Sequence, residues 1–151
     1  IKKIEDLINR SYLVTASKKT KEALRPPKEW IIPSNPQYFD IIHAFDTTDT
    51  IHWKQGQSIK TGDMVFLYVG APVSAILYKC LVIETGIPYR GKNVNVNIKT
   101  LMMIRLQRRY PPDRFPFERL KSDYGIYAVR GPRGIPENLS EDLKLFEERH
   151  K

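Results

Sequence analysis

The chain has 151 residues, 41% of them hydrophobic, which is enough for one folded domain with a hydrophobic core. The formal net charge is +8, and residues 1–28 hold eight lysines and arginines against three acids. The absence of any run of 18 apolar residues argues against a membrane-spanning helix, and a single cysteine excludes an internal disulfide. Such an excess of positive charge favours polyanionic partners, of which nucleic acid is the commonest.

The basic N-terminal part differs in composition from the rest of the chain. Apolar residues at roughly helical spacing predict a short helix over residues 3–14, and residues 15–28 read as a linker or exposed helix that ends at Pro26-Pro27. We expect residues 1–27 to be a basic helical appendage or the remnant of an upstream domain, and residues 28–151 to be the folded domain. Because the sequence starts at Ile1, we also expect this domain to be fused to, or to act with, another domain.

The first half of the folded part predicts two strands and a helix. Residues 29–33 form a short apolar strand, and Pro36 after Ser34 or Asn35 predicts the first turn of a helix over residues 37–45. Residues 46–59 are polar and predict a loop, which carries Trp53. Residues 60–63 predict a tight turn into a strand over residues 64–69, whose continuous apolar character indicates burial on both faces.

The second half predicts longer strands and short helices. Strands are expected over residues 73–84, 95–107 and 126–129, with loops over 86–93 and 130–134. Helices are expected over residues 117–121 and 141–149, the second capped by Ser140. Five or six strands without a regular βαβ rhythm predict an α+β fold, built as a mixed β-barrel or curved sheet flanked by short helices.

The sequence offers no recognisable catalytic or metal site. Its histidines are not spaced as metal ligands, and the lone Cys80 lies in an apolar strand that favours a buried thiol, consistent with a reducing cytoplasm. Thr85 and Gly86 follow Glu84, so the D…ExK pattern of many nucleases is absent. We therefore expect no metal, no cofactor and no catalytic residue.

Three features of the sequence stand together in a defined order. The segment from Trp30 to Asn35 is a short strand that ends in Ser-Asn, and Trp53 follows 18 residues after Asn35. Lys60-Thr61-Gly62-Asp63 then turns into the strand that carries Val65 and Tyr68. This ordered set resembles the EVE domain, a PUA-like domain related to the YTH readers, over residues 30–84 and more loosely as far as Arg130-Gly131. Pro33 departs from the lysine that precedes Ser-Asn in YTH readers.

The resemblance implies a pocket for a base, modified or methylated, flipped out of its stack. Tryptophan supplies a flat face for stacking, and an asparagine side chain supplies a donor and an acceptor for a base edge. The residues expected in this pocket are Ser34, Asn35, Trp53, Tyr68 and Val69. On spacing alone, Ser34-Asn35 before Pro36 is more readily a helix cap, and Trp30 is more readily a core residue than a ligand contact.

Basic residues in the C-terminal half are candidates for contact with a phosphate backbone. These residues are Arg105, Arg108, Arg109, Arg130 and Arg133. A solvated basic face explains each of them equally well.

Three functions remain open. The first, favoured by the resemblance, is a cytoplasmic module that binds nucleic acid, DNA rather than RNA, through a modified base. The second is a small nuclease or nucleobase-processing enzyme, and the third is a module that binds a protein or small ligand in the same pocket.

Overall fold

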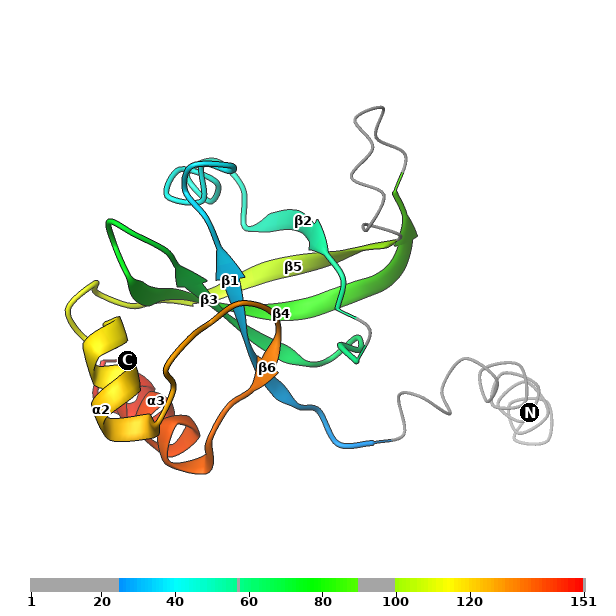
Figure 1. The fold of residues 1–151 in the computed structure, drawn as a ribbon. Coiled ribbons are helices and arrows are strands. Elements are labelled where there is room, and N and C mark those ends of the chain that lie inside the picture. Colours follow the sequence, from blue (N-terminus) through cyan, green and yellow to red (C-terminus); the bar gives the residue numbers. More distant parts are fainter. Residues whose placement is uncertain (1–24, 57, 90–99, 151) are drawn as a thin grey trace, which may run out of the picture.

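A computed structural model of the chain describes residues 25–56, 58–89 and 100–150. Its strands form a mixed sheet in the order β2-β5-β4-β3-β1-β6 (Figure 1). The strands are β1 (Glu29–Ser34), β2 (Thr50–Lys54), β3 (Met64–Val69), β4 (Ala75–Pro88), β5 (Thr100–Arg109) and β6 (Arg133–Gly134), and the helices are α2 (Phe117–Tyr124) and α3 (Glu137–Arg149). The sheet is not closed into a barrel, because β2 and β6 are its unpaired edges. The predicted α+β class, with a curved mixed sheet and short helices, is confirmed.

The pairing of β1 with β3 places two strand ends side by side. β1 runs parallel to β3, with Trp30 opposite Val65 and Ser34 opposite Val69. β3, β4 and β5 form an antiparallel meander, and the register shifts once between β3 and β4 and three times between β4 and β5. Because bulges bend the strand that carries them, these shifts account for the curvature of the long strands.

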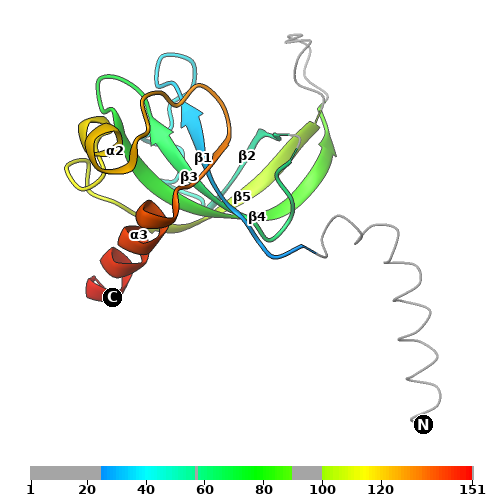
Figure 2. The same cartoon turned by 60° about the horizontal axis from the view of Figure 1, so that its bottom comes forward.

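Both faces of the central strands are buried, as the continuous apolar run of residues 64–69 predicts. Val65 and the neighbouring Ile32 belong to a core that also includes residues of β4, β5 and the segment after β1. Phe66 and Ile31 point to the opposite face, where α2 and α3 cover the sheet (Figure 2). In the described parts of the chain, no helix is long and apolar enough to cross a membrane.

Two segments of the first half differ from the prediction. Residues 37–45 form a succession of turns instead of a helix, because Tyr38 N and Phe39 N both donate to Asn35 O and no regular helical ladder follows. The turns bury Ile41 and Phe45, whereas Phe39, which we expected on the buried face of that helix with Ile42 and Phe45, is 44% exposed. Residues 50–54, expected in a loop, form the edge strand β2.

The C-terminal third also departs from the expected elements. Residues 126–129 are irregular, since Ile126 N bonds to Leu120 O and completes the left-handed end of α2 at Gly125. The strand of this region, β6, lies in the predicted loop over 130–134. α3 begins at Glu137, so Ser140 is inside the helix and donates its hydroxyl hydrogen to Glu29 instead of capping.

The carboxylate of Asp63 joins the start of the domain to the turn before β3. It is fully buried and accepts a bidentate pair from Arg25, at 2.9 and 2.7 Å. It also accepts from the indole nitrogen of Trp30 at 2.9 Å and from the backbone nitrogens of Lys28 and Lys60 at 2.9 and 3.0 Å. Trp30 is therefore held in place by a polar bond in addition to its packing against the core.

The charge state of Asp63 follows from these contacts. Burial alone acts to raise the pKa of the carboxyl group, but the hydrogen bonds from Arg25, Lys28, Lys60 and Trp30 outweigh burial and lower the pKa from 3.8 to about 2. The folded domain thus prefers the charged carboxylate, and ionisation of Asp63 is coupled to folding.

We expect Asp63→Asn to lower the free energy of unfolding by about 3 kcal/mol, because it removes one partner of a buried ion pair and places an amide donor where the carboxylate accepted from other donors. Chemical denaturation at neutral pH measures this loss. Asp113→Asn, an exposed change of the same chemistry, should alter stability by less than about 0.5 kcal/mol. Equal stability of the two variants would contradict the central role of Asp63.

The low pKa of Asp63 also predicts an acid dependence of stability. A carboxyl group whose pKa is lower in the folded state stabilises the fold fully above its unfolded pKa of 3.8, and this stabilisation disappears as the pH falls through about 2. The lowered pKa thus contributes about 2 kcal/mol to the free energy of unfolding at neutral pH. Unfolding curves of the wild type and Asp63→Asn between pH 6 and pH 2 should therefore converge toward the acid end, and a constant gap would refute the linkage.

Candidate nucleic-acid interface

A hollow of about 370 Å³ lies where the parallel strands β1 and β3 end. Its wall combines the end of β1, the end of β3, one residue of β2 and one residue of the segment between α2 and β6. The lining residues are Pro33, Ser34, Asn35, Gln37, Lys54, Tyr68, Gly70, Ala71 and Val129. We call this hollow the strand-end pocket.

Ser34 and Asn35 occupy the positions that the motif predicted at the pocket. Ser34 is buried, and its hydroxyl donates to Tyr68 O at 3.4 Å. Asn35 is exposed, and its side-chain oxygen accepts from the backbone nitrogen of Gln37 at 2.9 Å. Asn35 thus stabilises a turn and not the helix start that its spacing predicted, and among the described residues its amide nitrogen has no acceptor.

The β1 and β3 ends approach each other closely beneath the pocket. Gly70 N donates to Ser34 O at 2.9 Å, and a Cβ atom at Gly70 would lie 3.4 Å from the same oxygen. A Cβ atom at position 70 would therefore make an ordinary van der Waals contact with this oxygen.

The structure separates the two β3 residues expected in the pocket. Tyr68 lines it, and burial raises the pKa of its hydroxyl, an effect that a hydrogen bond with Ser74 opposes. Val69 is wrong as a pocket residue, because its side chain is completely buried in the core on the other face of β3. Side chains alternate along a strand, and on β3 Val69 faces the core while Tyr68 faces the pocket.

Trp53 lines a neighbouring hollow and not the strand-end pocket itself. It lies on β2, partly buried, with its ring edge-on to Phe39 at 5.4 Å between centroids. Its hollow has a volume of about 140 Å³ and shares Pro33 and Lys54 with the strand-end pocket. The predicted single pocket bounded by Trp53 and Ser34-Asn35 is therefore two adjoining hollows, which we call the strand-end pocket and the Trp53 hollow.

A third hollow of about 220 Å³ continues the series. It includes Trp30 and shares Gly56 and Pro132 with the Trp53 hollow. Together the three hollows follow the open side of the sheet between β1–β6 and β2.

The five arginines predicted to contact a phosphate backbone differ in their exposure and in their contacts within the domain. Arg105 and Arg130 are exposed, and Arg133 lies half-buried on β6. Arg108 donates to His150 O and lies 4.0 Å from Glu147, whereas Arg109 stacks on Tyr78 and donates to Phe45 O. Contacts within the domain thus hold Arg108 and Arg109, which leaves Arg105, Arg130 and Arg133 as the freer cations.

Sequence reasoning missed six lining residues, namely Pro33, Gln37, Lys54, Gly70, Ala71 and Val129. Lys54 follows Trp53 directly, and assigning β2 as a strand would have drawn attention to it. Val129 reaches the pocket only through the path of the chain from α2 to β6, for which the sequence holds no local signal.

The remaining polar candidates lie elsewhere. Cys80 is buried in the core as expected, and burial raises the pKa of its thiol to about 12. Within residues 25–56, 58–89 and 100–150, no three His, Cys, Asp or Glu side chains gather as metal ligands would.

Because Trp53 packs against the core as well as lining a hollow, Trp53→Ala should lower the free energy of unfolding by about 2 kcal/mol, less than the roughly 3–5 kcal/mol of a fully buried aromatic residue. The sequence alone predicts little change, because it places Trp53 in a loop. Tyr127→Ala is the control, since Tyr127 is 70% exposed and should leave stability almost unchanged. If thermal or chemical denaturation finds Trp53→Ala as stable as Tyr127→Ala, the side chain of Trp53 does not contribute to the stability of the core.

Comparison with known proteins identifies the fold. No protein-family model and no curated protein matches the chain. Among solved structures, the S128A mutant of ZmASCH from Zymomonas mobilis superposes with a TM-score of 0.56 at 10% identity, covering 79% of this chain and 96% of that one. A hypothetical protein from Leishmania major gives a TM-score of 0.59 at 14% identity, covering 83% of this chain and 98% of that one.

Rpa0253 from Rhodopseudomonas palustris gives a TM-score of 0.55 at 12% identity, covering 76% of this chain and 88% of that one. Identities this low establish the fold alone. ASCH domains have a PUA-like fold related to that of EVE domains, so the expected PUA-like fold is confirmed and the EVE assignment stays a prediction. The domain has the PUA-like fold of ASCH domains.

Proposed function

We propose that this domain binds nucleic acid and holds one base, extruded from its stack, in the strand-end pocket. The observation that carries the proposal is the composition of this pocket. Two side-chain amides, Asn35 and Gln37, and the cation of Lys54 meet there beside the apolar surfaces of Pro33 and Val129. Its volume of about 370 Å³ lies within the range of small-ligand sites, roughly 300–1,000 Å³.

The chemistry of the lining suits a base more than a simple apolar ligand. A base edge presents donors and acceptors together, and an amide side chain offers both. The oxygen of Asn35 accepts from Gln37 N, so its amide nitrogen is the group that remains to donate to a ligand acceptor. Tyr68, at the wall, supplies an aromatic surface.

The adjoining Trp53 hollow extends the site to a second nucleotide. Its tryptophan provides a stacking surface, and stacking of one base on an aromatic side chain contributes roughly 1–3 kcal/mol. Lys54 lines both hollows, where its ammonium group can contact the phosphate between the two nucleotides. Arg130 and Arg133 are close in sequence to Val129 and Pro132, which line these hollows. Their positive charges add to that of Lys54.

The PUA-like fold supports the proposal, and the EVE resemblance of residues 30–84 supplies its finer part. On that basis we propose that the preferred base is modified, that DNA is preferred to RNA, and that binding occurs without catalytic turnover.

Binding titrations against single- and double-stranded DNA and RNA, with and without defined base modifications, test this function. We expect salt-dependent binding, because phosphate contacts release counterions, and a preference among the modified bases. Salt-independent binding, or cleavage of the oligonucleotide, would overturn the proposal.

Asn35→Ser provides the sharper test of the pocket. Serine keeps an oxygen that can accept from Gln37 N but removes the amide donor. Affinity for the preferred oligonucleotide should fall by about 1–3 kcal/mol, the value of a specific base contact, while binding to its unmodified counterpart changes less. Asn138→Ser, an exposed amide change on α3, is the matched control, and equal losses for both variants would exclude Asn35 from base recognition.

A further inference from the structure

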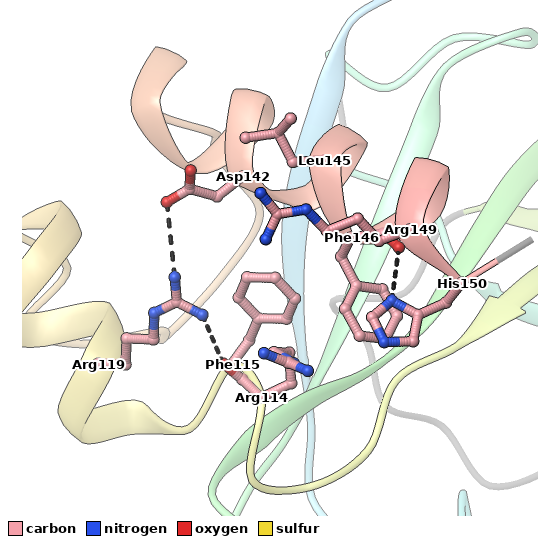
Figure 3. A pocket seen from close by; sticks show the side chains of 8 residues that line it. All are labelled: Arg114, Phe115, Arg119, Asp142, Leu145, Phe146, Arg149 and His150. Carbon is pink, nitrogen blue, oxygen red and sulfur yellow. Dashed lines mark hydrogen bonds and ion pairs between the residues drawn. The ribbon is translucent and has the colours of Figure 1, made fainter.

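A separate hollow lies between α2 and α3, and it shares no residue with the strand-end pocket (Figure 3). Its volume is about 140 Å³, and three arginines, Arg114, Arg119 and Arg149, line it. Figure 3 shows their guanidinium groups around the ring of Phe115, with Asp142 as the carboxylate on the lining. We call this feature the arginine hollow.

The floor of the arginine hollow is closed and apolar. Phe115 and Phe146 form it, with exposed fractions of 1% and 8% and ring centroids 6.1 Å apart. Both rings are already packed in the core between the sheet and the helices. An apolar ligand group therefore finds no opening into which it could insert.

Arg119 is fixed by contacts within the domain. Its guanidinium lies 3.2 Å from Asp123 and 3.6 Å from Asp142, and it donates to Arg114 O at 2.8 Å. It also lies over the ring of Phe115. Its charge is thus balanced, and its role is to hold the segment that carries Arg114 against α2.

Arg114 and Arg149 differ from Arg119 in having no carboxylate partner among the residues that the structure describes. Arg114 lies over the ring of Phe146 at 5.1 Å, which leaves the edge of its guanidinium group available. Arg149 lies in the last turn of α3. Two unneutralised guanidinium groups therefore line one small concave surface whose single acid, Asp142, is already paired with Arg119.

We infer that the arginine hollow binds a phosphate of the nucleic-acid backbone, in addition to the phosphate contact proposed for Lys54. This inference rests on the proposed function and adds to it a second anchoring point on the helical face of the domain. Guanidinium groups bind phosphate with paired, charge-assisted hydrogen bonds, and a phosphate has enough oxygens to accept from two arginines at once.

An acidic peptide is the competing occupant, and the structure favours phosphate over it. Peptide recognition usually relies on an apolar anchor placed in an open pocket, whereas the floor here is filled by Phe115 and Phe146. Leu145, at 45% exposure, is the only large apolar side chain exposed on the described lining, and a single exposed leucine is common on protein surfaces.

The test compares Arg114→Gln, Arg149→Gln and the double variant with the wild-type chain, using the oligonucleotide that the wild type binds best. Loss of one phosphate contact should reduce the slope of log affinity against log salt by about 0.7–0.9 and lower affinity about five- to eightfold at 0.1 M salt. Base preference should not change. Lys121→Gln with Lys144→Gln is the matched control, because these exposed lysines lie on α2 and α3 without lining the hollow.

A second probe separates this inference from the proposed function. Inorganic polyphosphate carries phosphates without bases, and polyglutamate of similar charge carries carboxylates. We expect polyphosphate to shift the side-chain Nε–Hε NMR signals of Arg114 and Arg149 in the wild type, and polyglutamate to shift them much less.

The outcomes are distinct. If the wild type binds the oligonucleotide but the double variant keeps its affinity and salt slope, the arginine hollow is not a phosphate site while the proposed function stands. If polyphosphate shifts both arginine signals but no oligonucleotide binds, the proposed function fails, and with it the assignment of the phosphate to a nucleic acid. An equal or stronger response to polyglutamate, or a loss of base preference in the double variant, overturns the inference.

Discussion

The rest of the domain depends on the hydrogen bonds and the ion pair of the buried Asp63 carboxylate. It ties Arg25 and the backbone of Lys28, which precede β1, to Lys60 and the turn that begins β3. The same carboxylate fixes the indole of Trp30 on β1. Since β1 and β3 are parallel and far apart in sequence, no short turn can set their register. The Asp63 contacts secure that register at one end, and the strand-end pocket lies at the other.

Strands β1, β3, β4 and β5 could be predicted from sequence because their apolar patterns are local, whereas the edge strands β2 and β6 could not. The run over residues 64–69 indicated burial on both faces, and the structure packs alternate residues of β3 into two separate cores. The helix expected over residues 37–45 does not form, and turns take its place. Ile41 and Phe45 are buried four residues apart, as in a helix, but tight turns achieve the same burial. Apolar spacing therefore identified Phe45 as a core residue but not Ile41, and it did not determine the backbone between them.

The candidate site was only partly predictable. Ser34-Asn35 line the pocket because a strand end is a local feature, and the ordered motif located it. Val69 was misplaced by one residue, which in a strand means the opposite face. Lys54 and Val129 reach the pocket through pairings between distant segments. The arginine hollow likewise brings Arg114 to the end of α3, a juxtaposition that depends on how α2 and α3 pack and that charge counting cannot reveal.

The open sheet explains why the proposed base site has room. A closed barrel would pair β2 with the opposite edge and fill the seam with backbone hydrogen bonds. Here the edges are short, since β2 has five residues and β6 only two, and the three connected hollows follow the unpaired seam. Unpaired edges favour aggregation unless something protects them, and Lys54 on β2 and Arg133 on β6 place charge on both. The same cations that discourage pairing with another strand give this seam the positive charge that a nucleic-acid strand requires.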